Sequence, residues 1–361
     1  MGTNDMKKAT AYRRFFASLR MTVLAGITVV SCGKQLQEMG GDPVAFDTSL
    51  TETATKAPLP DNTTFAVMAW YTGQDAWSAS ASPNFMYNED VLFDGSAYTY
   101  SPVKYWPNNP GDKVTFWAYC PHNADGLTLR ESAGGSAYNN TSATGIPYLD
   151  FTTVTGNGLV DLMSADFDAT VKDRSKPSLN TPVHFTFRHL LSRVVFHFVK
   201  VDDASNNYYV RLTEVSIKDI YQNADHPGAS GSWGHHSNNG DLSVYADATP
   251  EELTDNPLVP TTGTDMAVMP IPQTLTETTA KIYISYVVVP KSGGDPVSKE
   301  GEFLITGPTG LHPSWVHPAG WDQNFQYTYN VQITTGGNPI IFSASIEPWE
   351  DADPWVYHYV D

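Results

Sequence analysis

Apolar residues recur with a period of two over most of the chain, which is the spacing of β-strands. In KVTFWAYC (113–120), the even-numbered side chains from Val114 to Cys120 fall on one face, and the odd-numbered ones, including Trp117, fall on the other. This alternation predicts a strand in which Cys120 is a buried core thiol.

Two segments, FAVMAWY (65–71) and KIYISYVVV (281–289), are apolar on both faces. Such sequences are typical of central strands, whose two faces are both covered. Turn clusters at 106–112, 229–241 and 334–337 contain the Gly, Pro and Asn residues that supply special backbone angles. Beyond the N-terminal segment no apolar pattern of period 3.6 is sustained. We therefore predict an all-β fold made of antiparallel sandwiches.

The apolar positions change parity within VHFTFRHLLSRVVFHFV (183–199). They are odd-numbered from Val183 to Phe187 and even-numbered from Val194 to Phe198. A strand cannot change parity without a bulge or a break, because a slip of one residue sends every side chain to the opposite face. We therefore predict a domain boundary here, with an N-terminal β-sandwich at 43–188 and a C-terminal β-sandwich at 189–361.

The N-terminal segment has the features of a secretory signal. Five basic residues precede or flank Met21–Val30, a run of ten mostly apolar residues. As a helix this run would span only about 15 Å, so it is too short to cross a bilayer. The order Val-Val-Ser-Cys at 29–32 resembles the bacterial lipobox. We predict that the signal peptide 1–31 is removed and that Cys32 is lipidated at the start of a linker, 32–42. An ordinary signal peptide with an incidental cysteine is the alternative.

Lipidation of Cys32 affects both the disulfide content and the partners of the exported chain. Two or three acyl chains give a stable membrane tether, whereas one chain binds marginally. Cys120 then has no cysteine partner, so the exported chain has no disulfide. Removal of residues 1–31 leaves 16 basic and 38 acidic residues, a formal charge of −22. This charge repels phosphate backbones, so we expect no nucleic-acid partner.

No motif in the sequence supports catalysis, a metal site or a cofactor. His184, His189 and His197 lie in one predicted strand pair, but spacings of five and eight residues separate their side chains. His235 and His236 are adjacent in a turn and lack a nearby third ligand. Paired carboxylates remain an open alternative, because such residues meet in space rather than along the chain. We predict that the chain is not an enzyme and has no catalytic, metal or cofactor-binding residues.

An ordered set of short motifs resembles the fimbrillin-like lipoproteins of type V pili, in particular the minor-fimbrillin-like group. The resemblance covers essentially the whole exported chain. The motifs, in order, are Cys32, VAF (44–46), ATKA (54–57), FAVMAWY (65–71), YWP (105–107), VTFWAYCP (114–121), DLMSA (161–165), VHFTFRHLLSRVVFHF (183–198), MPIPQTL (269–275), KIYISY (281–286), YTYNVQI (327–333) and SIEPWE (345–350). Each motif is weak by itself, but their order and spacing are specific to the family.

The resemblance implies two tandem transthyretin-like, Greek-key sandwiches and a structural role in a fimbrium. In polymerising members a protease removes the first strand, and an extended segment of a neighbouring subunit fills the vacated groove by β-strand complementation. The exchanged strand here would be VAFDTSL (44–50), with Val44, Phe46, Thr48 and Leu50 facing the core, and cleavage would follow Lys56. No arginine occurs between Cys32 and Pro60. The arginine-specific maturation best known in the family therefore does not apply here: another protease acts, or the subunit stays uncut as an anchor or a cap.

The C-terminal segment alternates Trp355, Tyr357 and Tyr359 with smaller residues, so it is either the last strand of its own sheet or a donor segment. The expected location is the outer membrane of a Gram-negative bacterium, at the cell surface or in a fimbrium. The expected partners are other pilus subunits, the membrane through the lipid, and a host or bacterial surface ligand. The alternative function is a lipid-anchored carbohydrate- or protein-binding module that does not polymerise. Its aromatic platform would come from loop tryptophans, namely Trp77, Trp233, Trp315 and Trp321.

Overall fold

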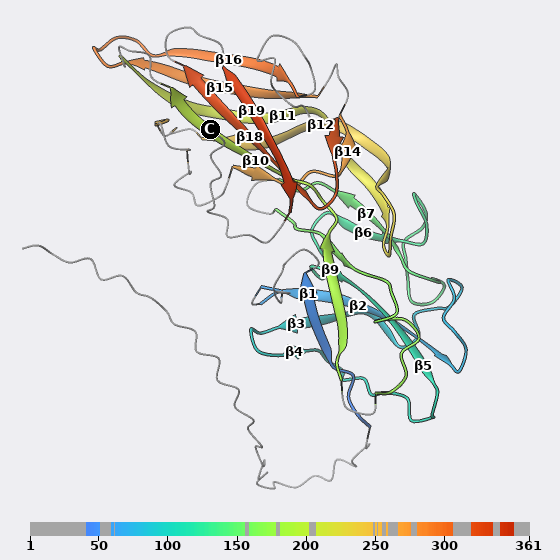
Figure 1. Ribbon diagram of the computed structural model, residues 1–361. Coiled ribbons are helices and arrows are strands. Elements are labelled where there is room, and N and C mark those ends of the chain that lie inside the picture. The colour runs from blue at the N-terminus through green and yellow to red at the C-terminus, as the bar shows by residue number, and fades with distance from the viewer. Residues whose placement is uncertain are drawn as a thin grey trace, which may run out of the picture. The chain divides into compact units, whose positions relative to one another are not determined.

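The described part of the chain is built from β-strands. The computed structural model (Figure 1) describes residues 41–50, 59–60, 62–155, 159–177, 181–201, 207–247, 250, 252–254, 258, 266–275, 280–305, 319–334 and 340–349. Its strands are β1 Phe46–Leu50, β2 Thr64–Gly73, β3 Met86–Phe93, β4 Tyr98–Thr99, β5 Lys113–Cys120, β6 Leu127–Arg130, β7 Tyr148–Thr152, β8 Met163–Ala165, β9 Val183–His189, β10 Arg193–Val201, β11 Tyr208–Pro227, β12 Gly234–Ala246, β13 Ala267–Val268, β14 Gln273–Thr274, β15 Lys281–Pro290, β16 Val297–Leu304, β17 Gly320–Trp321, β18 Phe325–Thr334 and β19 Ile341–Pro348. No helix occurs in these ranges, so the prediction of an all-β fold is confirmed, and nothing in them forms a membrane-spanning helix.

The first sheet has seven strands in the order β1-β9-β8-β5-β2-β3-β4. β2 and β5 lie at its centre, and both of their faces are buried. The even-numbered residues of β5 pack into one apolar cluster, whereas Trp117 and Tyr119 pack into another on the opposite face. The predicted parity of KVTFWAYC is thus confirmed. Cys120 is 1% exposed, and burial raises the pKa of its thiol.

The second large sheet joins residues from both halves of the sequence. Its order is β16-β15-β11-β7-β6, and β12 also pairs with β11. The 20-residue β11 pairs with β15 through Tyr208–Lys218 and with β7 through Asn223–Pro227. β15 is central, as predicted, but only alternate side chains of it are fully buried.

A four-stranded sheet, β13-β10-β18-β19, covers the C-terminal part of the second sheet. Residues of β10 and β18 pack with those of β11 and β15 in one apolar cluster, which makes this part a β-sandwich. The short strands β14 and β17 form a separate pair.

The change of parity in 183–199 coincides with a break between strands. β9 ends at His189 and β10 begins at Arg193, so the predicted interruption is confirmed. Leu190 and Leu191 are buried in the break, and the indole of Trp233 donates a hydrogen bond to the carbonyl oxygen of Leu190 at 2.7 Å. The division into domains at 188/189 stays a prediction, and β7, which also pairs with β6, pairs with β11 across this boundary in the sequence.

Candidate strand-exchange site

β1 is the edge strand of the seven-stranded sheet. It pairs in parallel with β9, from Phe46 opposite Val183 to Leu50 opposite Phe187, and Figure 1 shows the two strands side by side. The residues just before β1 bond on the other side, where the amide of Val44 donates to the carbonyl oxygen of Lys104 at 2.9 Å. Among the described residues, β1 itself is therefore paired along one edge only, which is the position from which a strand can leave or be replaced.

The four side chains predicted to face the core are all buried. Val44 is 2% exposed, Phe46 5%, Thr48 4% and Leu50 4%. Full burial of an apolar side chain of this size stabilises a fold by about 1.5–3 kcal/mol. The three apolar residues together contribute roughly 5–9 kcal/mol, which is comparable with the whole stability of an ordinary domain. The sheet therefore needs a strand in this groove.

Phe46 is surrounded by four aromatic rings. Its ring lies 5.6 Å from that of Phe185 in a stacked arrangement and 5.3 Å from that of Tyr100. The rings of Phe65 and Phe116 approach it edge-on at 6.3 Å and 6.2 Å. Such aromatic pairs add stability beyond the area that they bury.

Two tyrosines that the sequence analysis did not single out hold the same strand by polar contacts. The hydroxyl groups of Tyr98 and Thr48 are 2.6 Å apart, and the hydroxyl of Tyr100 donates to the carbonyl oxygen of Val44 at 2.8 Å. Burial raises the pKa of both tyrosines, that of Tyr100 to about 12, so both hydroxyl groups are protonated near neutral pH. In the sequence, only the spacing of two residues between Tyr98 and Tyr100 could have indicated that they act on the same face.

The outward side chains of β1 share one histidine of β9. His184 Nδ1 lies 3.1 Å from Asp47 Oδ2, and His184 Nε2 lies 2.9 Å from Ser49 Oγ. The side chains contact one another in the order Asp–His–Ser, as in the catalytic triad of serine hydrolases. Ser49, however, is only 1% exposed, so its hydroxyl is not accessible to a substrate. The three residues fasten β1 to β9, and only the parallel pairing brings them together.

The other predicted site residues lie outside the described residues. They are Cys32, Lys56, Trp355, Tyr357 and Tyr359. The described chain ends at Trp349, whose indole stacks on the ring of His189 at 4.0 Å. His189 Nδ1 lies 2.8 Å from Asp161 Oδ1. Trp349, the last described residue, therefore packs against the end of β9.

The described tryptophans form no exposed aromatic platform. Trp233 is 8% exposed and Trp321 is 1% exposed. Trp77 is half-buried against Trp70 and Phe167. Trp315 lies outside the described residues.

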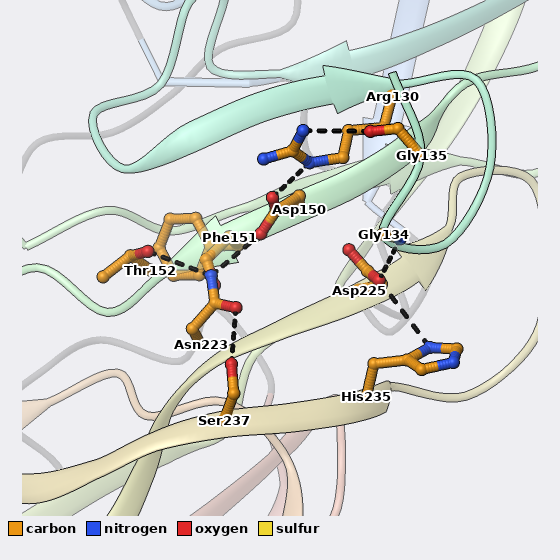
Figure 2. Close-up of polar contacts among 10 residues, drawn as sticks. All are labelled: Arg130, Gly134, Gly135, Asp150, Phe151, Thr152, Asn223, Asp225, His235 and Ser237. Carbon is orange, nitrogen blue, oxygen red and sulfur yellow. Dashed lines mark hydrogen bonds and ion pairs between the residues drawn. The ribbon is translucent and has the colours of Figure 1, made fainter. Parts of the chain in front are cut away.

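A polar network fastens β6 and β7 to β11 and β12 (Figure 2). Arg130 forms an ion pair with Asp150, whose other carboxylate oxygen accepts a hydrogen bond from the Asn223 amide at 2.8 Å. Ser237 of β12 donates to Asn223 Oδ1 at 3.0 Å. The buried Asp225 accepts from the amide of Gly134 at 2.8 Å, and His235 Nδ1 lies 3.6 Å from it. These contacts connect strands far apart in sequence. Within the ranges that the structure describes, no three metal-ligating side chains gather.

The described residues thus form an all-β protein in which β1, the first strand among them, lies at a sheet edge with its inward side chains buried. The chain belongs to the fimbrillin-like family, whose model matches residues 51–349. The match begins at the residue after β1.

Two further comparisons agree with the family. The chain is 28% identical over 200 residues to the fimbrium subunit Fim1C of Phocaeicola vulgatus, a match that covers 50% of this chain and 51% of that protein. The chain thus spans about half the length of this curated relative. The crystal structure of a fimbrial protein from Bacteroides vulgatus has the same fold, with a TM-score of 0.63 and 19% identity over 85% of this chain and 99% of that one.

Proposed function

We propose that this chain is a structural subunit or an accessory protein of a type V fimbrium, assembled by exchange of β1 for an extended segment of another subunit. Membership of the fimbrillin-like family supports a fimbrial role. The exchange mechanism is supported by the position of β1. It is an edge strand that pairs with one neighbour, and four of its side chains are buried. In this role the protein contributes to cell adhesion and catalyses no reaction.

The energetics favour replacement of the strand over its simple loss. An empty groove would expose the rings around Phe46 and the unpaired backbone of β9, which is an aggregation hazard. An incoming strand restores both the hydrogen bonds and the buried area. The net free energy of exchange is then small, and it depends on which strand fills the pockets better.

We propose further that the precursor is exported, lipidated at Cys32 and carried to the outer membrane, where it reaches the cell surface or a fimbrium. Cleavage after Lys56 would free β1, because the scissile bond would lie six residues beyond Leu50. An uncut chain would keep β1 as a plug and remain held by its lipid as an anchor. The cut form and the uncut form are alternatives, which the following experiment distinguishes.

Limited cleavage near Lys56 tests the proposal. The exported chain is cut at an engineered protease site within 51–58, and its size is followed on native and SDS gels beside a variant truncated before Trp355. SDS-resistant oligomers that need both the cut and the tail would indicate a shaft subunit. Oligomers that need the cut and a second subunit, but not the tail, would indicate a tip or an anchor. A cut chain that stays monomeric with every partner would refute strand exchange and favour the anchored binding module.

A further inference from the structure

The groove of β1 has two positions whose surroundings restrict what can fill them. One receives Phe46 and the other receives Thr48, two residues further along the same face. The outer positions of this face, Val44 and Leu50, hold aliphatic side chains buried in the same apolar cluster. Aliphatic sites accept Val, Ile, Leu or Met at a small cost. The two inner positions therefore decide which strand fits.

The position of Phe46 requires a ring. Four aromatic rings surround it with centroid distances between 5.3 and 6.3 Å. A small aliphatic residue would leave a cavity among these rings, which the surroundings could fill only in part.

The position of Thr48 requires a small hydroxyl-bearing residue. Its hydroxyl is 2.6 Å from that of Tyr98. The Tyr98 ring is held by Phe93, stacked at 4.7 Å, and by Phe65, edge-on at 5.9 Å. These contacts keep the Tyr98 ring in place. A valine at the position of Thr48 would therefore deprive the Tyr98 hydroxyl of a hydrogen-bond partner. A large side chain would have to displace the ring.

We propose that the groove selects a donor strand with an aromatic residue at the register of Phe46 and threonine or serine two residues later, and that this chain's own C-terminal segment is a poor donor for another copy. The selected partner is then a different subunit that carries an aromatic-x-Thr/Ser segment. This selectivity rests on the strand-exchange function proposed above.

The sequence of the C-terminal segment conflicts with the groove in each parallel register that places a tryptophan or a tyrosine opposite the position of Phe46. With Trp355 or Tyr357 at the register of Phe46, a tyrosine falls at the register of Thr48. With Tyr359 at the register of Phe46, the carboxylate of Asp361 falls there instead. A tyrosine overfills this position, and a buried carboxylate is costly without a positive partner.

Competition between peptides measures the selectivity. A form of the chain without Cys32, residues 33–361, is cut at an engineered protease site within 51–58 and keeps its own β1 fragment as the competitor. Fluorescent peptides of sequence PVAFDTSL (43–50) and its variants are added, and displacement of the fragment is followed by anisotropy. The unaltered peptide should displace the fragment, and its affinity is the reference for the variants. We expect Phe46→Ala to weaken binding about a hundred-fold, and Thr48→Val about five-fold.

The remaining peptides test the size limit and supply the control. Thr48→Tyr and the C-terminal peptide DPWVYHYVD (353–361) should bind about thirty-fold more weakly or worse. The matched control is Pro43→Ala, whose side chain is exposed and should change binding by less than about three-fold. A Tyr98→Phe variant of the protein completes a double-mutant cycle, because without the tyrosine hydroxyl the unaltered peptide and its Thr48→Val variant should bind almost equally.

The outcomes separate selectivity from the exchange function. If the unaltered peptide does not enter the cut protein, strand exchange at β1 is wrong, and the selectivity falls with it. If all peptides compete equally, or the C-terminal peptide matches PVAFDTSL, the groove accepts strands but the proposed selectivity is overturned. A five-fold effect of Thr48→Val that persists in Tyr98→Phe would overturn the role of the hydroxyl pair.

Discussion

Replacement of Phe46 by alanine tests how much the edge strand contributes to the fold. The ring is 5% exposed and contacts four others, so its removal deletes a large apolar side chain and leaves a cavity. Phe→Ala changes in cores cost about 3–5 kcal/mol. Because β1 lies at a sheet edge and can shift to fill part of the space, we expect a loss at the lower end of that range, about 3 kcal/mol.

Equilibrium unfolding in urea, followed by tryptophan fluorescence, measures this loss. With an m-value of about 2–3 kcal/mol/M, the midpoint of the transition that includes the first sheet should fall by about 1 M without a change in slope. The matched control is Phe325→Ala, since the Phe325 ring is 36% exposed and its removal should cost less than about 1 kcal/mol. Equal losses in the two variants would refute the claim that the ring cluster holds β1. In the chain cut within 51–58, the Phe46→Ala fragment should also be displaced faster than the unaltered one.

Three other properties follow from the sequence and the structure. Cys32→Ala should release the chain from the membrane fraction and block removal of residues 1–31; a variant that is still membrane-bound and normally processed would exclude lipidation. Cys120, buried and with a raised thiol pKa, should react with a thiol reagent only as fast as the protein unfolds, so rapid labelling of the native protein would contradict its core position. Burial lowers the pKa of His226 from 6.5 to about 4, so the unfolded state binds more protons between these values. Stability should therefore fall by roughly 3 kcal/mol as the pH drops from 6.5 to about 4. His226→Phe should remove most of that loss, and an unchanged pH dependence in urea titrations would contradict this origin.

The attachment of β1 combines two kinds of contact that respond differently to exchange. The hydrogen bonds to β9 are main-chain bonds, which any strand can make. The contacts of Phe46 and Thr48 are specific to side chains and must be matched by the incoming strand. The outward contacts of His184 with Asp47 and Ser49 also depend on side chains and favour the original strand. On the proposed exchange mechanism, the groove would keep β1 until a strand that matches these side-chain contacts better replaced it.

Local features of the sequence were sufficient to predict the all-β fold, the buried face of β5, the break between β9 and β10, and the inward residues of β1. These features depend on a period of two, which each strand imposes on its own side chains whatever its partners are. Val44, Phe46, Thr48 and Leu50 could be predicted as one buried face for this reason.

Tertiary structure alone decided which strands are neighbours, and with that the chemistry around β1. Nothing local indicates that β1 pairs in parallel with β9, a strand distant in the sequence, or that Tyr98 and Tyr100 close the same groove. The pairing of β7 with the end of β11 is equally invisible in the sequence. Pairing depends on the closure of long loops and on the fit of whole faces, and many pairings are compatible with the same alternation of side chains. The apolar pattern therefore determined that β1 has an inward face, and the fold determined that this face meets a cage of rings and a tyrosine hydroxyl.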